Sequence, residues 1–144
     1  MRFYIGYKFT NITDKEGLKK KVGELAEHIN TKGHTTFVLG RDIQDWHSSP
    51  FPMIKTLPHV FKNMLMSDCL ISLITDNSSS TGLLVENILA TVLLKKRGFL
   101  ISTTVNRNKY NFLVKPEFST TFNADYDFFS AADLLVSRLL DQQP

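Results

Sequence analysis

The stretch from Asp68 to Leu100 constrains the fold of this chain more than any other. It begins with a short apolar run, Cys69 to Ile74, continues through a hydroxyl-rich turn that ends at Gly82, and closes with a long apolar segment, Leu83 to Leu94. A short apolar run bounded by turn residues is typical of a buried strand, and a longer one indicates a helix. We therefore predict a strand–loop–helix unit whose helix carries one carboxylate, Glu86.

Strands and helices alternate along the rest of the chain. Further strands are predicted at Phe3–Ile5, Thr35–Leu39, Gly98–Ser102 and Thr120–Asn123. One helix is predicted from a capping box at Thr13 and Glu16 to a stop at Gly33, a second over Ile54–Leu65, and a third from a capping box at Ser130 and Asp133 through Leu140. A long loop follows the second strand, over residues 40–50, and carries the only tryptophan, Trp46.

This alternation implies right-handed crossovers and a parallel sheet with helices on both faces. We predict an α/β fold with a single domain over residues 1–144, built on a doubly wound (flavodoxin-like, Rossmann-like) sheet of five parallel strands in the order 2-1-3-4-5. In such a sheet, ligands bind in the crevice at the carboxyl ends of strands one and three. The loops Gly6–Asn11 and Thr75–Gly82 open onto this crevice, so Glu86 is expected to overlook it.

Composition excludes several classes of protein. The chain has 144 residues, of which 42% are hydrophobic, which is enough for a real core. The single cysteine, Cys69, permits no internal disulfide and favours a reducing compartment, and no residue cluster resembles a metal site. Glu86 interrupts the longest apolar segment, so no membrane span is predicted. We expect a soluble, cytoplasmic protein with no cofactor and no membrane partner.

The mildly basic charge does not predict a nucleic-acid polymer as partner. Net charge is +3 with a pI near 9.0, but no run of Lys and Arg is interleaved with exposed aromatic residues. The densest cluster, Lys19-Lys20-Lys21, lies on an amphipathic helix where Lys20 can pair with Glu24. We interpret it as a solvated helix face.

The central motif, Ser80-x-Gly82-x-x-x-Glu86 with Ala90 four residues later, resembles the signature of the nucleoside 2-deoxyribosyltransferase superfamily. That superfamily includes the 2'-deoxynucleoside 5'-phosphate N-hydrolases. The opening run Phe3–Phe9 is similar to the family's first strand and substrate loop. Asp68, the run into the fourth strand and the chain length also agree.

The resemblance implies that Glu86 is a nucleophile that attacks C1' of the sugar. Cleavage of an N-glycosidic bond passes through an oxocarbenium-like transition state, which a carboxylate can stabilise and then capture as a glycosyl ester. In the resemblance, transferases acting on free nucleosides carry an acidic residue six positions before the glutamate, whereas monophosphate hydrolases carry Ser. Ser80 therefore implies a nucleoside 5'-monophosphate substrate, and Lys8 on the facing loop can supply positive charge.

The remaining candidate substrate-binding residues lie in loops. Gly6 permits a close approach after the first strand, and Tyr7 and Trp46 can either stack on a nucleobase or close over the core. Asn123 is expected to reach a neighbouring subunit's site, as happens in the family, so a homodimer or a higher homo-oligomer is implied.

Two departures from the family pattern leave alternatives open. Val60 stands where the family has an Asp that orients the nucleophile or protonates the base, and the adjacent His59 replaces it only if the register shifts by one. Asn87-Ile88 replaces the usual Leu-Gly after the glutamate. The leading hypothesis is an N-glycosidase acting on a nucleoside 5'-monophosphate. The alternatives are a deoxyribosyltransferase that exchanges bases on free nucleosides, a non-catalytic nucleotide-binding module, and a TIR-like NAD hydrolase.

Overall fold

The computed structural model describes residues 1–9, 12–46, 53–76, 80–103, 119–122 and 125–141. The strands are β1 (Arg2–Tyr7), β2 (Thr35–Val38), β3 (Cys69–Ile74), β4 (Arg97–Thr103) and β5 (Ser119–Phe122). The helices are α1 (Lys15–Thr31), α2 (Leu39–Asp42), α3 (Met53–Leu65), α4 (Thr81–Asn87), the π-helical η1 (Ile88–Leu93) and α6 (Asp125–Asp141).

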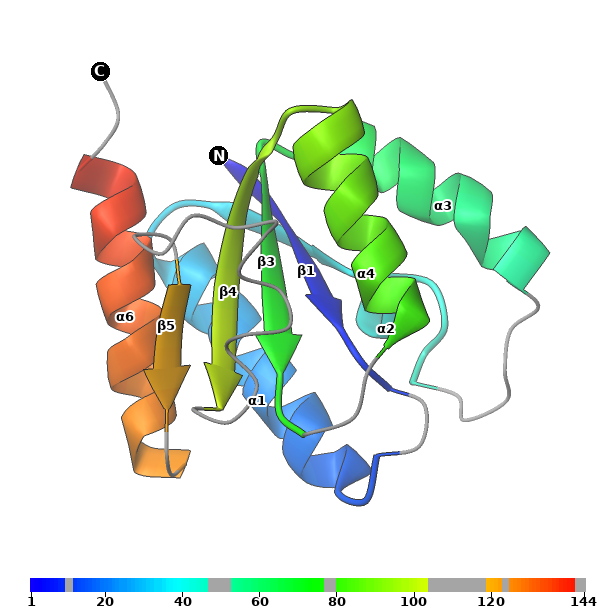
Figure 1. The fold of residues 1–144 in the computed structure, drawn as a ribbon. Helices are drawn as coiled ribbons and strands as arrows, with labels where there is room; N and C mark the ends of the chain where they lie inside the picture. Colours follow the sequence, from blue (N-terminus) through cyan, green and yellow to red (C-terminus); the bar gives the residue numbers. More distant parts are fainter. Residues whose placement is uncertain (10–11, 47–52, 77–79, 104–118, 123–124, 142–144) are drawn as a thin grey trace.

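The strands form a parallel sheet in which β1 lies between β2 and β3 (Figure 1). The predicted order 2-1-3-4 of the first four strands is confirmed. Beyond β4, the edge position is taken by β5, where Leu100 pairs with Ser119. Because β2 and β3 flank β1, the chain changes direction beside β1, and a crevice is expected at the carboxyl ends of β1 and β3.

Helices cover both faces of the sheet, and each face has its own core. On one face, α1 and α6 pack against alternate residues of the strands, such as Ile5, Ile71 and Ile101. On the other face, α3 and η1 pack against Tyr4 and Leu70, while α4 contributes to a smaller cluster. The side chains of successive strand residues point to opposite faces, so Tyr4 and Gly6 of β1 point toward α3 and α4.

Several predicted boundaries are corrected by the structure. The side chain of Asp14, rather than Thr13, caps α1 by accepting a hydrogen bond from the Gly17 amide at 2.8 Å. Ser130 lies inside α6 and therefore caps no helix. The predicted loop after β2 begins with the short helix α2. The predicted helix over Leu83–Leu94 is divided into α4 and η1.

Two other expectations, both about α1, are confirmed. Gly33 follows α1 with a φ of 82°, the left-handed conformation that a glycine stop requires. Lys20 and Glu24 approach to 3.9 Å on the outer face of α1. Among the described residues, no helix is both long enough and apolar enough to cross a membrane.

Candidate functional site

The Glu86 carboxylate lies over β1 and is held there by Tyr4. The Tyr4 hydroxyl donates a hydrogen bond to Glu86 Oε1 at 2.9 Å, and the Tyr4 side chain is fully buried. The other oxygen, Oε2, lies against Gly6. A Cβ at residue 6 would be only 2.7 Å from Oε2 and 3.0 Å from a methyl of Leu83. Gly6 is therefore needed for the close approach of the carboxylate to the strand.

The environment of Glu86 raises its pKa from 4.5 to about 7. Burial is the main cause, because it penalises the charged form, while the hydrogen bond from Tyr4 works in the opposite direction and lowers the pKa. The pKa of Tyr4 is raised well above its usual value, chiefly by burial and then by the neighbouring Glu86 charge. Glu86 is thus poised near neutral pH, where a carboxylate can act either as a nucleophile or as an acid–base group.

A buried polar pair fixes the helix that carries Glu86. Asn87 is fully buried, and its amide donates hydrogen bonds to the Ser72 hydroxyl at 2.8 Å and to the Leu83 carbonyl at 2.7 Å. The Ser72 hydroxyl in turn donates to Asn87 Oδ1 at 3.1 Å. Asn87 directly follows Glu86 in α4, and Ser72 lies in the middle of β3. The bonds between them therefore join α4 to the sheet right beside the carboxylate. They limit rotation of α4 about its axis, and such a rotation would swing the carboxylate away from Tyr4.

A small cavity opens beside the carboxylate. It has a volume of about 70 Å³. Its lining comes from three parts of the chain. From β1 come residues that include Tyr4, Gly6 and Tyr7, from the segment after β2 come Leu39 and Gln44, and from α4 comes Glu86. The structure therefore brings together Glu86, Gly6 and Tyr7 of the predicted site residues, at the crevice that the strand order predicts.

The wall of this cavity next to Tyr7 is built from the turn after β2. The Gly40 amide donates a hydrogen bond to the Tyr7 hydroxyl at 2.8 Å, and a Cβ at residue 40 would collide with that hydroxyl and with the Trp46 ring. The pKa of Tyr7 is raised above its usual value, mainly by burial. The hydrogen bond from Gly40 lowers this pKa, but its effect is smaller than that of burial. Trp46 packs on Tyr7 with ring centroids 5.7 Å apart, and it does not line the cavity.

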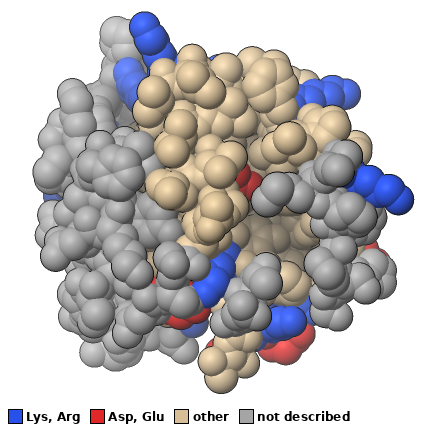
Figure 2. Space-filling view, turned by 45° about the vertical axis from the view of Figure 1, so that its right-hand side comes forward, with Lys and Arg blue, Asp and Glu red and all other residues tan. Residues whose placement is uncertain are grey.

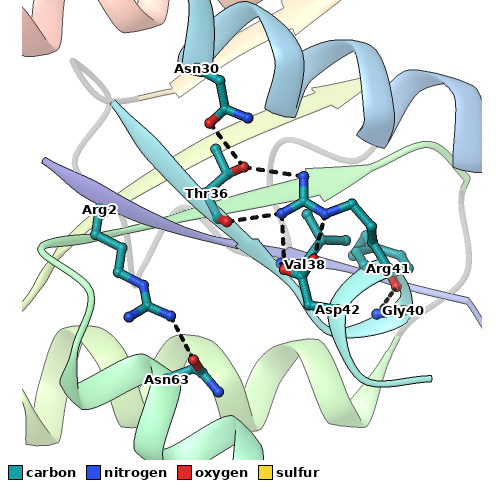
Figure 3. A network of polar contacts seen from close by, with 9 residues as sticks. Arg2, Asn30, Thr36, Val38, Gly40, Arg41, Asp42 and Asn63 are labelled. Carbon is teal, nitrogen blue, oxygen red and sulfur yellow. Dashed lines mark hydrogen bonds and ion pairs between the residues drawn. The ribbon is translucent and has the colours of Figure 1, made fainter. Parts of the chain in front are cut away.

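A polar network holds this turn in place (Figure 3). Arg41 donates two hydrogen bonds to Asp42, at 2.6 and 2.9 Å, and another to the Thr36 carbonyl at 2.9 Å. Asp42 also accepts a hydrogen bond from the Val38 amide at 2.8 Å. The network ties α2 back onto β2, so that Gly40 stays over Tyr7 and the chain continues to Gln44 at the cavity.

The residues expected to meet a phosphate have other contacts in this structure. Lys8 is almost fully buried and forms an ion pair with Asp76 at 3.1 Å, so its charge is matched by a carboxylate from the facing loop. The Ser80 hydroxyl accepts a hydrogen bond from the Leu83 amide at 3.2 Å and caps α4. Gly82 is exposed in the first turn of α4, where a Cβ would meet only the Ser80 hydroxyl, 3.9 Å away.

The family's Asp position is part of the core. Val60 is 7% exposed and packs in the cluster that contains Tyr4 and Met64. His59 beside it is exposed and lies outside that core. Asn123 lies outside the described residues, as do Ser78 and Ser79. Among the described residues, no group of three metal-binding side chains comes together.

Sequence reasoning missed Tyr4, Ser72, Gln44 and Asn87 as parts of this site. Tyr4 and Ser72 lie in strands, inside apolar runs that give no hint of a polar contact. Each of the two residues still carries a signal, because a hydroxyl at a fully buried strand position needs a hydrogen-bond partner. The same holds for Asn87, whose polar amide stands in an otherwise apolar helix. Gln44 carried no signal in a loop without periodicity.

Compared by sequence, the chain matches no family model and no curated protein. Compared by structure, it is similar to the CMP N-glycosidase of Clostridium botulinum, with a TM-score of 0.66 and 15% identity over 93% of this chain and 99% of that one. It is also similar to a 2-deoxyribosyltransferase of Bacillus psychrosaccharolyticus, with a TM-score of 0.60 and 18% identity over 91% and 96%.

A third similar structure is a conserved protein of Enterococcus faecalis, with a TM-score of 0.62 and 13% identity over 92% of this chain and 96% of that one. The fold of this chain is therefore the fold of nucleoside 2-deoxyribosyltransferase-like structures, and it matches them along nearly their whole length.

Proposed function

We propose that the chain is an N-glycosidase that cleaves a nucleoside or deoxynucleoside 5'-monophosphate to the free base and a sugar 5-phosphate. One observation carries the proposal: the Glu86 carboxylate is held by Tyr4 beside a cavity, over the residue Gly6 that leaves room for it. The folds shared with a CMP N-glycosidase and a 2-deoxyribosyltransferase support the same class of chemistry. We treat residues 1–144 as one catalytic domain.

In the proposed reaction, Glu86 attacks C1' of the sugar while the bond from C1' to the base nitrogen breaks. The base leaves with the bonding electron pair and takes up a proton from solvent, and a glycosyl ester forms on Glu86. Water then attacks C1' and releases a proton to solvent, the ester bond breaks, and the Glu86 carboxylate is regenerated. Because the nucleophile must be ionised, a pKa of about 7 implies that the reaction rate rises with pH through neutrality.

The other site residues are assigned to substrate binding. Gly6 and Tyr7 would border the sugar and base, and Gln44 offers an amide at the cavity wall for hydrogen bonds to a base. Ser80, Gly82 and Lys8 would bind the 5'-phosphate, in which case Lys8 has to exchange its Asp76 partner for the phosphate. Stacking of Trp46 on a base and a contribution of Asn123 to a neighbouring site remain predictions.

Two alternatives each have a supporting observation. Transfer of the sugar between bases is the activity named for one of the similar structures. A non-catalytic nucleotide-binding module is supported by Val60, because a buried valine cannot protonate the leaving base. The experiment below separates all three.

The test is liquid chromatography of the free base released from a panel of deoxyribonucleotides, ribonucleotides, their nucleosides and NAD. We expect release from one or more monophosphates, and a decrease of about 10³-fold or more in the Glu86→Gln variant. Glu24→Gln, on the solvated face of α1, is the matched control and should retain full activity. Incorporation of an added labelled base would identify a transferase. No release by folded protein, with monophosphates still bound, would favour the binding module.

A further inference from the structure

Lys8 and Asp76 form an ion pair between the two loops that open onto the crevice. Lys8 directly follows β1, and Asp76 lies two residues after the end of β3. The Lys8 ammonium lies 3.1 Å from Asp76 Oδ2. Only 9% of the Lys8 side chain is exposed, against 28% of the Asp76 side chain. If the pair separated, Asp76 would therefore have access to water, whereas Lys8 would have almost none.

The buried ammonium of Lys8 needs a counter-charge. Within the part of the chain that the structure describes, Asp76 is the only acidic side chain that pairs with it. Removing one partner of such a pair is strongly destabilising, because the other charge is left alone in a region that water does not reach. Asp76 can thus leave Lys8 only when another anion takes its place.

Asp76 also lines a second cavity, which is separate from the cavity at the candidate site. The second cavity has a volume of about 190 Å³ and lies between the start of α1 and the loop after β3. Its walls include the hydroxyl-bearing residues Thr13 and Thr75 and the basic residue Lys21, whereas Lys8 is not part of them. A carboxylate that turns away from Lys8 therefore has room in this cavity, beside groups that can donate hydrogen bonds to it.

Mixed charge at this edge of the sheet is also visible from outside. Figure 2 turns the side of the molecule that bears α3 and α4 forward, and the edge at which the strands end is at the bottom, as in Figure 1. Basic and acidic side chains lie next to one another near that lower edge, whereas the surface above it is mostly uncharged. An anion that approaches the lower edge meets acidic neighbours as well as basic ones.

We propose that Asp76 is an internal competitor for the phosphate group of the substrate. In the empty site, Asp76 neutralises Lys8. When a nucleoside 5'-monophosphate binds, its phosphate replaces Asp76 on Lys8, and the Asp76 carboxylate turns into the second cavity. After the base has left, Asp76 returns to Lys8 and displaces the sugar 5-phosphate. The inference rests on the proposed function, because it takes Lys8 as the phosphate ligand, and it makes Asp76 a positioning residue.

Only a negatively charged group can make this exchange. A phosphate monoester carries a charge of about −1.5 to −2 near neutral pH, which is more than the single charge of the carboxylate that it replaces. A free 5'-hydroxyl is neutral and would leave the Lys8 ammonium unmatched. The Lys8–Asp76 pair therefore stays closed when a nucleoside without a phosphate is offered.

The competition weakens phosphate binding by a predictable amount. The apparent affinity of a ligand falls in proportion to the fraction of the protein that is competent to bind it. A pair that is formed about ten times as often as it is broken would weaken phosphate binding about 10-fold. Such weakening favours turnover, because binding energy that the substrate and the product share lowers KM and retains the product without raising kcat.

The test is isothermal titration calorimetry with inorganic phosphate and with ribose 5-phosphate, neither of which has to be cleaved. We expect Asp76→Asn, which has the same shape without the charge, to bind both about 10-fold more tightly than wild type. Asp14→Asn is the matched control, because Asp14 lines the same cavity and asparagine still caps a helix. The affinity of this control should stay within about 2-fold of wild type. In a Lys8→Met background, Asp76→Asn should no longer tighten binding.

Kinetics separates this role from a purely structural one. With a monophosphate that wild type cleaves, Asp76→Asn should lower KM about 10-fold and strengthen inhibition by ribose 5-phosphate by the same factor, with no gain in kcat. Base release with an unchanged phosphate affinity in Asp76→Asn would reject the competitor and retain the glycosidase. Tighter phosphate binding by Asp76→Asn without base release from any substrate would retain the competitor and reject the glycosidase.

Three results would overturn the proposal: no binding of phosphate to wild type or to Asp76→Asn, equal binding by the two proteins, and a gain of affinity that persists in the Lys8→Met background. If Asp76→Asn fails to fold, NMR of wild type decides. Saturating phosphate should shift the carboxyl carbon signal of Asp76 and leave that of Asp14 in place. An Asp76 signal that does not move would contradict the exchange.

Discussion

The two faces of the sheet differ in what they bury and in what they show to solvent. Under α1 and α6, the core is built from apolar side chains such as Leu25, Ile71 and Val136, and the outer surface of α1 carries charged pairs such as Lys20–Glu24. Under α3 and α4, polar groups are buried, including Tyr4, Ser72 and Asn87, while the outer surface carries most of the large apolar side chains that are exposed among the described residues.

We interpret this inversion as a division in which the first face provides stability and the second face carries the proposed site. Burying polar groups costs free energy unless each has a partner, and exposed apolar groups are a liability for a monomer. Both features are retained on the face that holds Glu86. The following experiments test this division of labour, beginning with the largest expected effect.

Truncation of apolar side chains should have very different costs on the two faces. Leu25→Ala removes a fully buried side chain under α1 and should lower the free energy of unfolding by about 2–5 kcal/mol. The matched change Leu93→Ala removes an exposed side chain and should cost the isolated monomer less than about 0.5 kcal/mol. Urea unfolding at low protein concentration measures both. Equal costs would contradict the division.

Removal of the Glu86 charge should stabilise the fold at high pH. The pKa is 4.5 in the unfolded chain and about 7 in the fold, so the folded state holds the proton more tightly. Ionisation of Glu86 therefore destabilises the fold: the cost is absent below about pH 4.5 and complete above about pH 7. Glu86→Gln should raise the free energy of unfolding by up to about 3 kcal/mol at pH 8.

Urea unfolding of both proteins between pH 4 and pH 8 measures this difference, which should shrink toward zero as the pH falls. Glu24→Gln, on the solvated surface of α1, should show no such trend. A Glu86→Gln variant that is less stable than wild type at pH 8 would mean that the carboxylate supports the fold.

Loss of the buried amide should cost less, and the loss should be reversible by a second change. Asn87→Leu leaves the Ser72 hydroxyl buried without its amide partner and should cost about 1–3 kcal/mol. Adding Ser72→Ala removes the unpaired hydroxyl and should restore part of the stability. If base release stays low in the restored double variant, Asn87 acts by positioning Glu86. If release returns with stability, its role is structural only.

The smallest effect is expected from the hydroxyl of Tyr4. Its hydrogen bond lowers the Glu86 pKa against the effect of burial, so Tyr4→Phe should raise that pKa, by about one unit or about 1.4 kcal/mol. The pH profile of base release should move to higher pH by the same amount, with little change of the rate at high pH. An NMR titration of Glu86 checks the shift without reference to activity.

The sheet could be predicted because its strands are apolar runs that recur between helical patterns. The position of Glu86 at the crevice followed from strand order and from the loop before its helix. The contacts of Glu86 could not be predicted, because Tyr4 reaches it from a strand 82 residues away in sequence. Helix starts were misplaced where two capping residues compete, as Thr13 and Asp14 do before α1. The apolar pattern of α3 predicted a helix, but periodicity alone does not distinguish the apolar side chains that pack on the core from those that the structure leaves exposed.

The wide turn of η1 has a consequence for how this chain tolerates changes of length. The Leu94 amide bonds to the Leu89 carbonyl five residues back, at 2.9 Å, so this segment holds one residue more than an α-helical turn would. Deleting one residue between Ile88 and Leu93 would convert the turn to α-helix and leave α4 and Glu86 in place. The side chains that follow would keep their orientation, because the deletion removes the one residue that the wide turn accommodates. A deletion within α4, by contrast, would rotate every later side chain of the helix by about 100° about its axis, so we expect this chain to tolerate the loss of a residue in η1 far better than in α4.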